Sequence, residues 1–98
     1  MAKRYNASSS KEVLPLGLAK RGYCGTIEQI DAGNVKSSLG QIEIERRLIE
    51  LGFVEGAQVE ILHEGLFGRD PIAVRVDSSK VALRRHEAMA IFVTDDAQ

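Results

Sequence analysis

The apolar residues of this chain recur with two spacings, one typical of a helix and one typical of a strand. Within residues 38–51, Ile44, Leu48 and Leu51 are spaced four and three positions apart, with charged residues between them. This spacing places the three side chains on one face of a helix. The pattern therefore predicts one α-helix over residues 38–51, whose apolar face is buried.

The ends of this predicted helix carry signals of their own. Ser38 and Gln41 have the spacing of a capping box at the start. Gly52 can adopt the left-handed conformation that ends many helices, and Phe53 can then fold back onto Leu48. The helix is thus expected to end just before Gly52.

Short strands are predicted along most of the remaining chain. Ile72, Val74 and Val76 alternate with other residues, which is the clearest strand pattern in the sequence. Further stretches of strand character cover residues 26–30, 59–63, 81–83 and 91–93. Ile27 and Ile30 are three apart, so their strand requires a bulge or a bend. Five short strands and one inserted helix predict a mainly β fold, a small closed β-barrel.

The two ends of the chain fall outside this pattern. Residues 1–12 are polar and are expected to form a flexible arm, residues 13–94 the domain, and residues 95–98 a frayed end. Leu14 and Leu16 alternate, but a proline and a glycine interrupt their stretch. An irregular segment that lays both leucines over one end of the barrel is favoured, and contact with a partner is the alternative.

Composition narrows the class of protein. Ninety-eight residues allow one domain, and 13 basic against 14 acidic residues give a net charge of −1. This balance argues against a dedicated nucleic-acid binder, which usually carries a basic face. No apolar run approaches the length of a membrane span or of a signal-peptide core. The single cysteine, Cys24, fits a reducing cytoplasm.

Catalytic motifs do not stand out. The sequence has no nucleophile elbow, and the glycines at 17 and 22 are not followed by the lysine of a P-loop. Cys24 lies between Gly22 and Gly25, where a small packed or turn cysteine is commoner than a reactive thiol. We therefore expect a protein that is not an enzyme.

Metal ligands are present only as scattered residues. The weak candidates form two adjacent pairs, His63 with Glu64 and His86 with Glu87, and Cys24 and Asp70 are further donors. None has the spacing of a metal-binding motif, and neighbours in a strand point to opposite faces. His63 is expected on the same strand face as Val59 and Ile61. No metal site and no required cofactor are expected, with weak or adventitious Fe²⁺ or Zn²⁺ contact left open.

Two large apolar residues stand between glycines at a predicted hairpin tip. Leu66 and Phe67 lie between Gly65 and Gly68, and the four residues are expected to form a loop. Large apolar side chains are costly in water, so the loop either folds back on the barrel or is covered by a partner. Leu66 and Phe67 are therefore the first candidates for partner binding, and Leu14 and Leu16 are the next.

Several motifs in order resemble the ferrous iron transport protein A (FeoA) family. The matching segments are spread over residues 13–94, and they end in a Leu-Arg-Arg-x-Glu-Ala motif. They are Leu16-Gly17-Leu18, Gly25-Thr26-Ile27, Arg47 to Phe53, Val59-Glu60-Ile61, Asp70 to Val76, Val81 to Ala88, and Ile91-Phe92-Val93. The resemblance implies an SH3-like β-barrel with a helix inserted early.

The resemblance also implies a role. FeoA-like proteins are small cytoplasmic accessories of bacterial ferrous iron uptake that act on FeoB, a membrane transporter with a GTPase domain. The implied protein is non-catalytic, docks on the cytoplasmic region of that transporter, and reaches the membrane only through it. The alternative is a stand-alone SH3-like regulatory domain related to metal-dependent transcriptional repressors. The sequence leaves the oligomeric state open.

Overall fold

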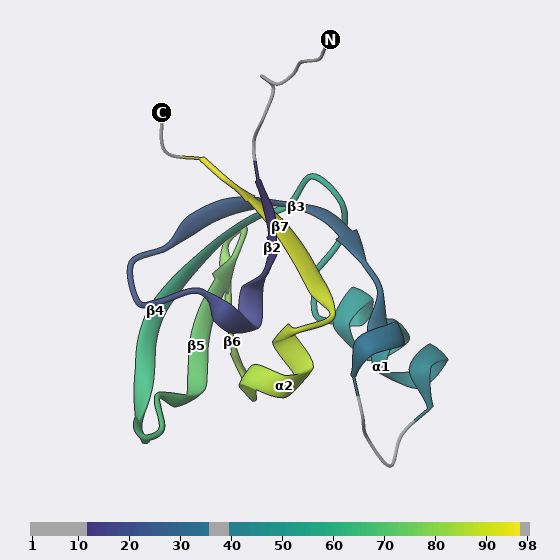
Figure 1. Cartoon of the computed structure of the whole chain (residues 1–98). Coiled ribbons are helices and arrows are strands. Elements are labelled where there is room, and N and C mark those ends of the chain that lie inside the picture. The colour runs from purple at the N-terminus through teal and green to yellow at the C-terminus, as the bar shows by residue number, and fades with distance from the viewer. Residues whose placement is uncertain (1–11, 36–39, 97–98) are drawn as a thin grey trace, which may run out of the picture.

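A single curved antiparallel sheet organises the chain. The computed structural model describes residues 12–35 and 40–96, and six strands are paired in the order β2-β7-β3-β4-β5-β6 (Figure 1). The strands are β2 (Val13–Pro15), β3 (Cys24–Ile30), β4 (Gln58–Phe67), β5 (Asp70–Val76), β6 (Ser79–Leu83) and β7 (Ile91–Asp95). The helical elements are α1 (Gln41–Glu50), α2 (Arg85–Ala88) and the 3₁₀ turns η1 (Leu16–Leu18) and η2 (Ala32–Asn34).

The sheet has one strand more than the sequence predicted. Val13–Pro15 was expected to be irregular, yet Leu14 pairs with Val93 of β7. β2 lies at the edge of the sheet, where proline's missing N–H need not cost a ladder hydrogen bond. The four-residue helix α2 was not predicted either.

Helix α1 is shorter than predicted. It begins at Gln41 and ends at Glu50, and the predicted start at Ser38 lies outside the described residues. Ile44 and Leu48 are buried, as expected, but Leu51 is 36% exposed. The prediction for Leu51 was wrong because this residue is the C-cap rather than part of the last turn.

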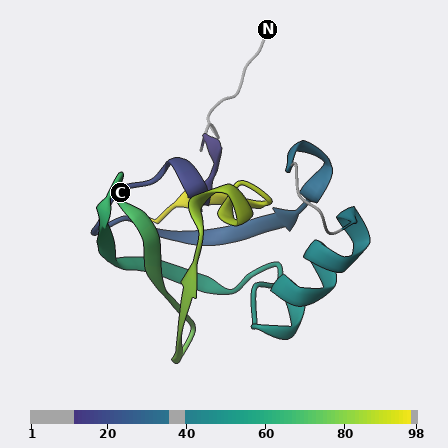
Figure 2. The same cartoon turned by 90° about the horizontal axis from the view of Figure 1, so that it is seen from below.

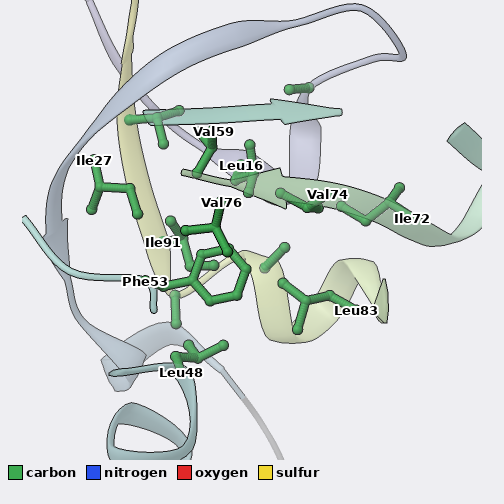
Figure 3. Close-up of a cluster of buried hydrophobic side chains, with 14 of the residues drawn as sticks. Leu16, Ile27, Leu48, Phe53, Val59, Ile72, Val74, Val76, Leu83 and Ile91 are labelled. Carbon is green, nitrogen blue, oxygen red and sulfur yellow. The ribbon is translucent and has the colours of Figure 1, made fainter. Parts of the chain in front are cut away.

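Phe53 takes the core position instead. Gly52 has φ of 105°, and the backbone N–H of Phe53 donates to the carbonyl of Leu48 at 3.0 Å. This is the Schellman ending that the sequence predicted. Phe53 is fully buried, and Figure 3 shows its ring pointing into the apolar cluster, with Leu48 beneath it.

Aliphatic side chains form the rest of the core. The largest fully buried ones come from η1 and four strands, and Figure 3 shows most of them. They are Leu16, Ile27, Ile61, Ile72, Ile91, Val74 and Val93. One continuous cluster therefore joins the sheet to α1 and α2.

Two bulges set which side chains face this core. The register of β3 against β7 shifts between Ile27 and Gln29, which confirms the irregularity predicted there. The register of β4 against β5 shifts between Ile61 and His63. The extra residue turns His63 outward, so the expectation that it shares a face with Val59 and Ile61 was wrong.

The chain ends are described only in part. Glu12 is the first described residue of the expected arm, and the rest of residues 1–12 lies outside the description. At the other end, Asp95 belongs to β7, and the N–H of Asp96 donates to the Cys24 carbonyl. Residues 97–98 also lie outside the described part.

Candidate functional site

The β4–β5 hairpin ends in two exposed apolar side chains. Leu66 and Phe67 are the last residues of β4, and Phe67 pairs with Asp70 across a two-residue turn. Both turn residues, Gly68 and Arg69, have positive φ (67° and 62°), as a type I′ turn requires. The sequence predicted a loop here, and this was wrong because the ladder continues to the turn itself.

Exposure decides between the two readings of this segment. Leu66 is 94% exposed and Phe67 is 87% exposed, so neither side chain folds back on the barrel. Figure 1 shows the hairpin extending away from the body of the sheet. The tip (Leu66 and Phe67) is therefore an uncovered apolar surface on a regular, hydrogen-bonded element.

Gly65 is required for the shape of this hairpin. A Cβ atom at this position would clash with the backbone carbonyl of Asp70 on the facing strand. The register also shifts between Glu64 and Phe67. The two strands thus cross closely just before the tip, which only a glycine permits.

Arg85 ties the base of the hairpin to the rest of the molecule. Its Nε donates to the carbonyl of Arg69 at 2.9 Å, and its Nη2 contacts Glu64 Oε2 at 2.7 Å. Its Nη1 donates to the carbonyls of Gly17 and Ala19 at 3.0 and 2.6 Å. One guanidinium therefore joins the turn, strand β4 and η1.

The backbone of Arg85 adds a further link. Its N–H donates to Asp70 Oδ1 at 2.8 Å, where β5 begins. The Arg85 side chain is only 19% exposed, and the Glu64 side chain 21%. The pair is thus largely shielded from water, where a charge-assisted hydrogen bond is stronger than at an open surface.

The other candidates for partner binding divide between core and surface. Leu16 is fully buried and Leu14 packs half-buried against the core. Burial, which the sequence favoured for both, leaves Leu16 no free surface for a partner. Leu18 is 63% exposed instead, between the two residues whose carbonyls bind Arg85.

The weak metal candidates are not brought together. Within residues 12–35 and 40–96, no three His, Cys, Asp or Glu side chains gather so that they could hold a metal ion. Glu64 is paired with Arg85, and Glu87 bonds the N–H of Arg84 and lies 3.3 Å from Arg47. His63 and His86 are exposed.

Folding without metal follows as a prediction. The aliphatic core needs no ion to close it, so a chelator such as EDTA should leave the thermal midpoint unchanged. Differential scanning calorimetry of the purified chain, with and without chelator, makes the comparison. A fall of several degrees would reveal a structural metal and contradict the prediction.

Tyr23 and Cys24 lie beside each other at the start of β3. Burial, followed by the charges of Asp95, Asp96 and Cys24, raises the pKa of Tyr23 to about 12. The phenol is therefore neutral at physiological pH. Cys24 is exposed, and its Sγ contacts the Gly22 carbonyl at 3.7 Å.

Comparison with solved structures defines the class of protein as a small SH3-like barrel. FeoA of Stenotrophomonas maltophilia, solved in complex with zinc and described as a prokaryotic SH3 domain protein, is 32% identical, with a TM-score of 0.62. The match covers 80% of this chain and 86% of that one. A manganese-dependent transcriptional repressor shares the fold, with a TM-score of 0.71 at 22% identity, over 88% of this chain and 43% of its own.

The chain belongs to the FeoA family. The FeoA domain matches residues 14–95, nearly the whole described chain. A Helicobacter pylori (strain J99) relative, named as an Fe(2+) transport protein A, is 27% identical over 73 residues, which are 74% of this chain and 86% of the relative. The fold and the family that the sequence indicated are thus confirmed.

Two features of the site escaped the sequence analysis. Arg85 was not singled out from the sequence, and only the folded chain separates this largely buried residue from the exposed Arg84. Its partners lie up to 68 positions away, so no local pattern could reveal them. Leu18 was not singled out either, and η1 turns it outward.

Proposed function

We propose that this protein is a non-catalytic accessory of ferrous iron transport that docks on the cytoplasmic region of an FeoB-type membrane transporter. Membership of the FeoA family and the Fe(2+) transport relative support the pathway. Among the described residues, no helix is long and apolar enough to span a membrane. Contact with the membrane would then run through the transporter.

The exposed tip of the β4–β5 hairpin is the observation that carries the docking surface. Leu66 and Phe67 are the two most exposed large apolar residues of the described chain. Binding energy at interfaces concentrates in a few large apolar anchors that become buried. A regular hairpin held at its base by Arg85 presents these two anchors at low cost in conformational entropy.

The docking role predicts a specific loss. The double change Leu66→Ser, Phe67→Ser should weaken binding to the transporter's purified cytoplasmic region at least tenfold, or about 1.4 kcal/mol. The thermal midpoint should move by no more than about 4–8 °C, the shift that 1 kcal/mol produces in a domain of this size. Biolayer interferometry and calorimetry on one preparation give both values.

Ile42→Ser is the matched control, because it removes an exposed apolar side chain from α1. Figures 1 and 2 place α1 and the hairpin tip on opposite sides of the molecule. This variant should bind the transporter as the parent chain does. Equal binding by the parent and the double variant would refute the tip as the docking surface.

No metal is required in this proposal. Zinc accompanies the Stenotrophomonas maltophilia protein, but the candidate donors here are dispersed or already paired. Any contact of Fe²⁺ or Zn²⁺ with exposed His63 or His86 would be weak and transient. The likeness to the manganese-dependent repressor, at 22% identity, supports a shared fold only.

A further inference from the structure

A second apolar surface lies on α1 and the turn that follows it. Eight large apolar residues of the described chain are exposed, and four of them fall within residues 42–54. These are Ile42, Ile49, Leu51 and Val54. Of these four, Ile49 and Val54 line one hollow together, and contiguous exposed apolar side chains of this kind mark an interaction site.

Part of this surface is hollowed into a groove. Ile49 of α1, Val54 of the following turn and Ile30 at the end of β3 line it together with Glu55, and its volume is about 210 Å³. Small-molecule sites usually measure roughly 300–1,000 Å³. This groove is therefore better matched to one large side chain of a polypeptide than to a whole ligand.

One carboxylate lines the groove, and no described cation lines it. Both arginines of α1 are already paired, Arg46 with Glu43 at 3.0 Å and Arg47 with Glu87 at 3.3 Å. Glu55 lines the groove itself, whereas Glu50 lies with Glu43, Arg46 and Arg47 around a separate hollow on α1. An occupant with a cationic side chain beside its apolar anchor would meet complementary charge.

We propose that the groove of Ile30, Ile49, Val54 and Glu55 binds an apolar residue of a polypeptide segment that carries lysine or arginine next to it. The apolar anchor fills the hollow, and the neighbouring cation lies against Glu55. Because α1 and the hairpin tip lie on opposite sides, one chain can hold both partners at once (Figures 1 and 2). The groove thus adds a second binding surface, independent of the tip.

Titration with short model peptides tests this directly. The probe is acetyl-Lys-Leu-Leu-Lys-amide, added to the full ¹⁵N-labelled chain, and acetyl-Glu-Leu-Leu-Glu-amide is its acidic counterpart. The basic peptide should shift the amide signals of Ile49, Val54 and Glu55 saturably, with weaker binding as salt rises. The acidic peptide should bind more weakly.

Two variants and their matched controls make the test specific. Glu55→Lys should weaken the basic peptide by about two- to fivefold, the effect of one exposed charge pair. Ile49→Ser should weaken it further, because the hollow loses part of its apolar wall. Leu18→Ser, which changes an exposed apolar residue of η1 outside the groove, and Glu12→Lys, the same charge change ahead of β2, should leave binding unchanged.

Three results would overturn the proposal. Shifts that spread over the whole protein surface without saturating would show unspecific attraction. Equal binding by the parent chain and Glu55→Lys would remove the charge argument. Groove signals that change with protein concentration in the absence of peptide would assign the surface to a second copy of this chain.

Discussion

Replacing Leu48 with alanine should destabilise the protein by about 2–5 kcal/mol, the range measured for buried leucines. Leu48 is 2% exposed and packs in the main cluster, and its carbonyl accepts the N–H of Phe53. Truncation would leave a cavity beside the Phe53 ring, and relaxation of α1 could fill it only in part. Urea unfolding followed by circular dichroism gives the change in free energy.

Leu51→Ala is the matched control for this prediction. The same helical spacing assigned both leucines to the core, but Leu51 is 36% exposed at the C-cap. Its truncation should cost about 1–1.5 kcal/mol, less than at Leu48, since the side chain already reaches water and no closed cavity forms. Equal losses for the two variants would contradict the burial of Leu48 and the helix end at Glu50.

Local signals explain how much of the fold was predictable. The spacing of Ile44 and Leu48 and the glycine at 52 act within a few residues, so α1 and its ending could be read directly. Helical spacing alone gave a wrong prediction for Leu51. Its helical spacing is correct, but the turn at Gly52 gives the core position to Phe53.

Long-range pairing explains what was missed. β2 forms because Leu14 pairs with Val93, some 80 positions along the chain. The three residues of β2 carry no sequence pattern that predicts this pairing. The bulge after Ile61 likewise depends on the register against β5. Alternation alone therefore placed His63 on the wrong face.

The sequence predicted which apolar residues form the candidate site, but not the contacts that hold the hairpin in place. Two large apolar residues between glycines identified Leu66 and Phe67, because their exposure is unusual whatever the exact turn. The type I′ turn places Arg69 at positive φ, which sequence preference would assign to glycine or asparagine. The role of Arg85 depends on carbonyls brought together only by folding.

Arg85→Met should cost about 2–4 kcal/mol, because it removes a largely shielded charge from several partners. The carboxylate of Glu64 would remain without its cation, and the carbonyls of Gly17, Ala19 and Arg69 would lose their donor. Methionine keeps most of the aliphatic volume, so the loss reports on the guanidinium. Urea unfolding measures it.

The neighbouring arginine separates this effect from a general loss of positive charge. Arg84 is exposed, and its contact with Glu87 runs through the backbone N–H, which Arg84→Met preserves. That variant should change stability by no more than about 0.5 kcal/mol, as is usual for surface positions. Hydrogen exchange should also become faster at residues 65–70 in Arg85→Met alone, because the hairpin loses its anchor at Arg69. Matching stability and exchange in the two variants would show that Arg85 does not hold the tip in place.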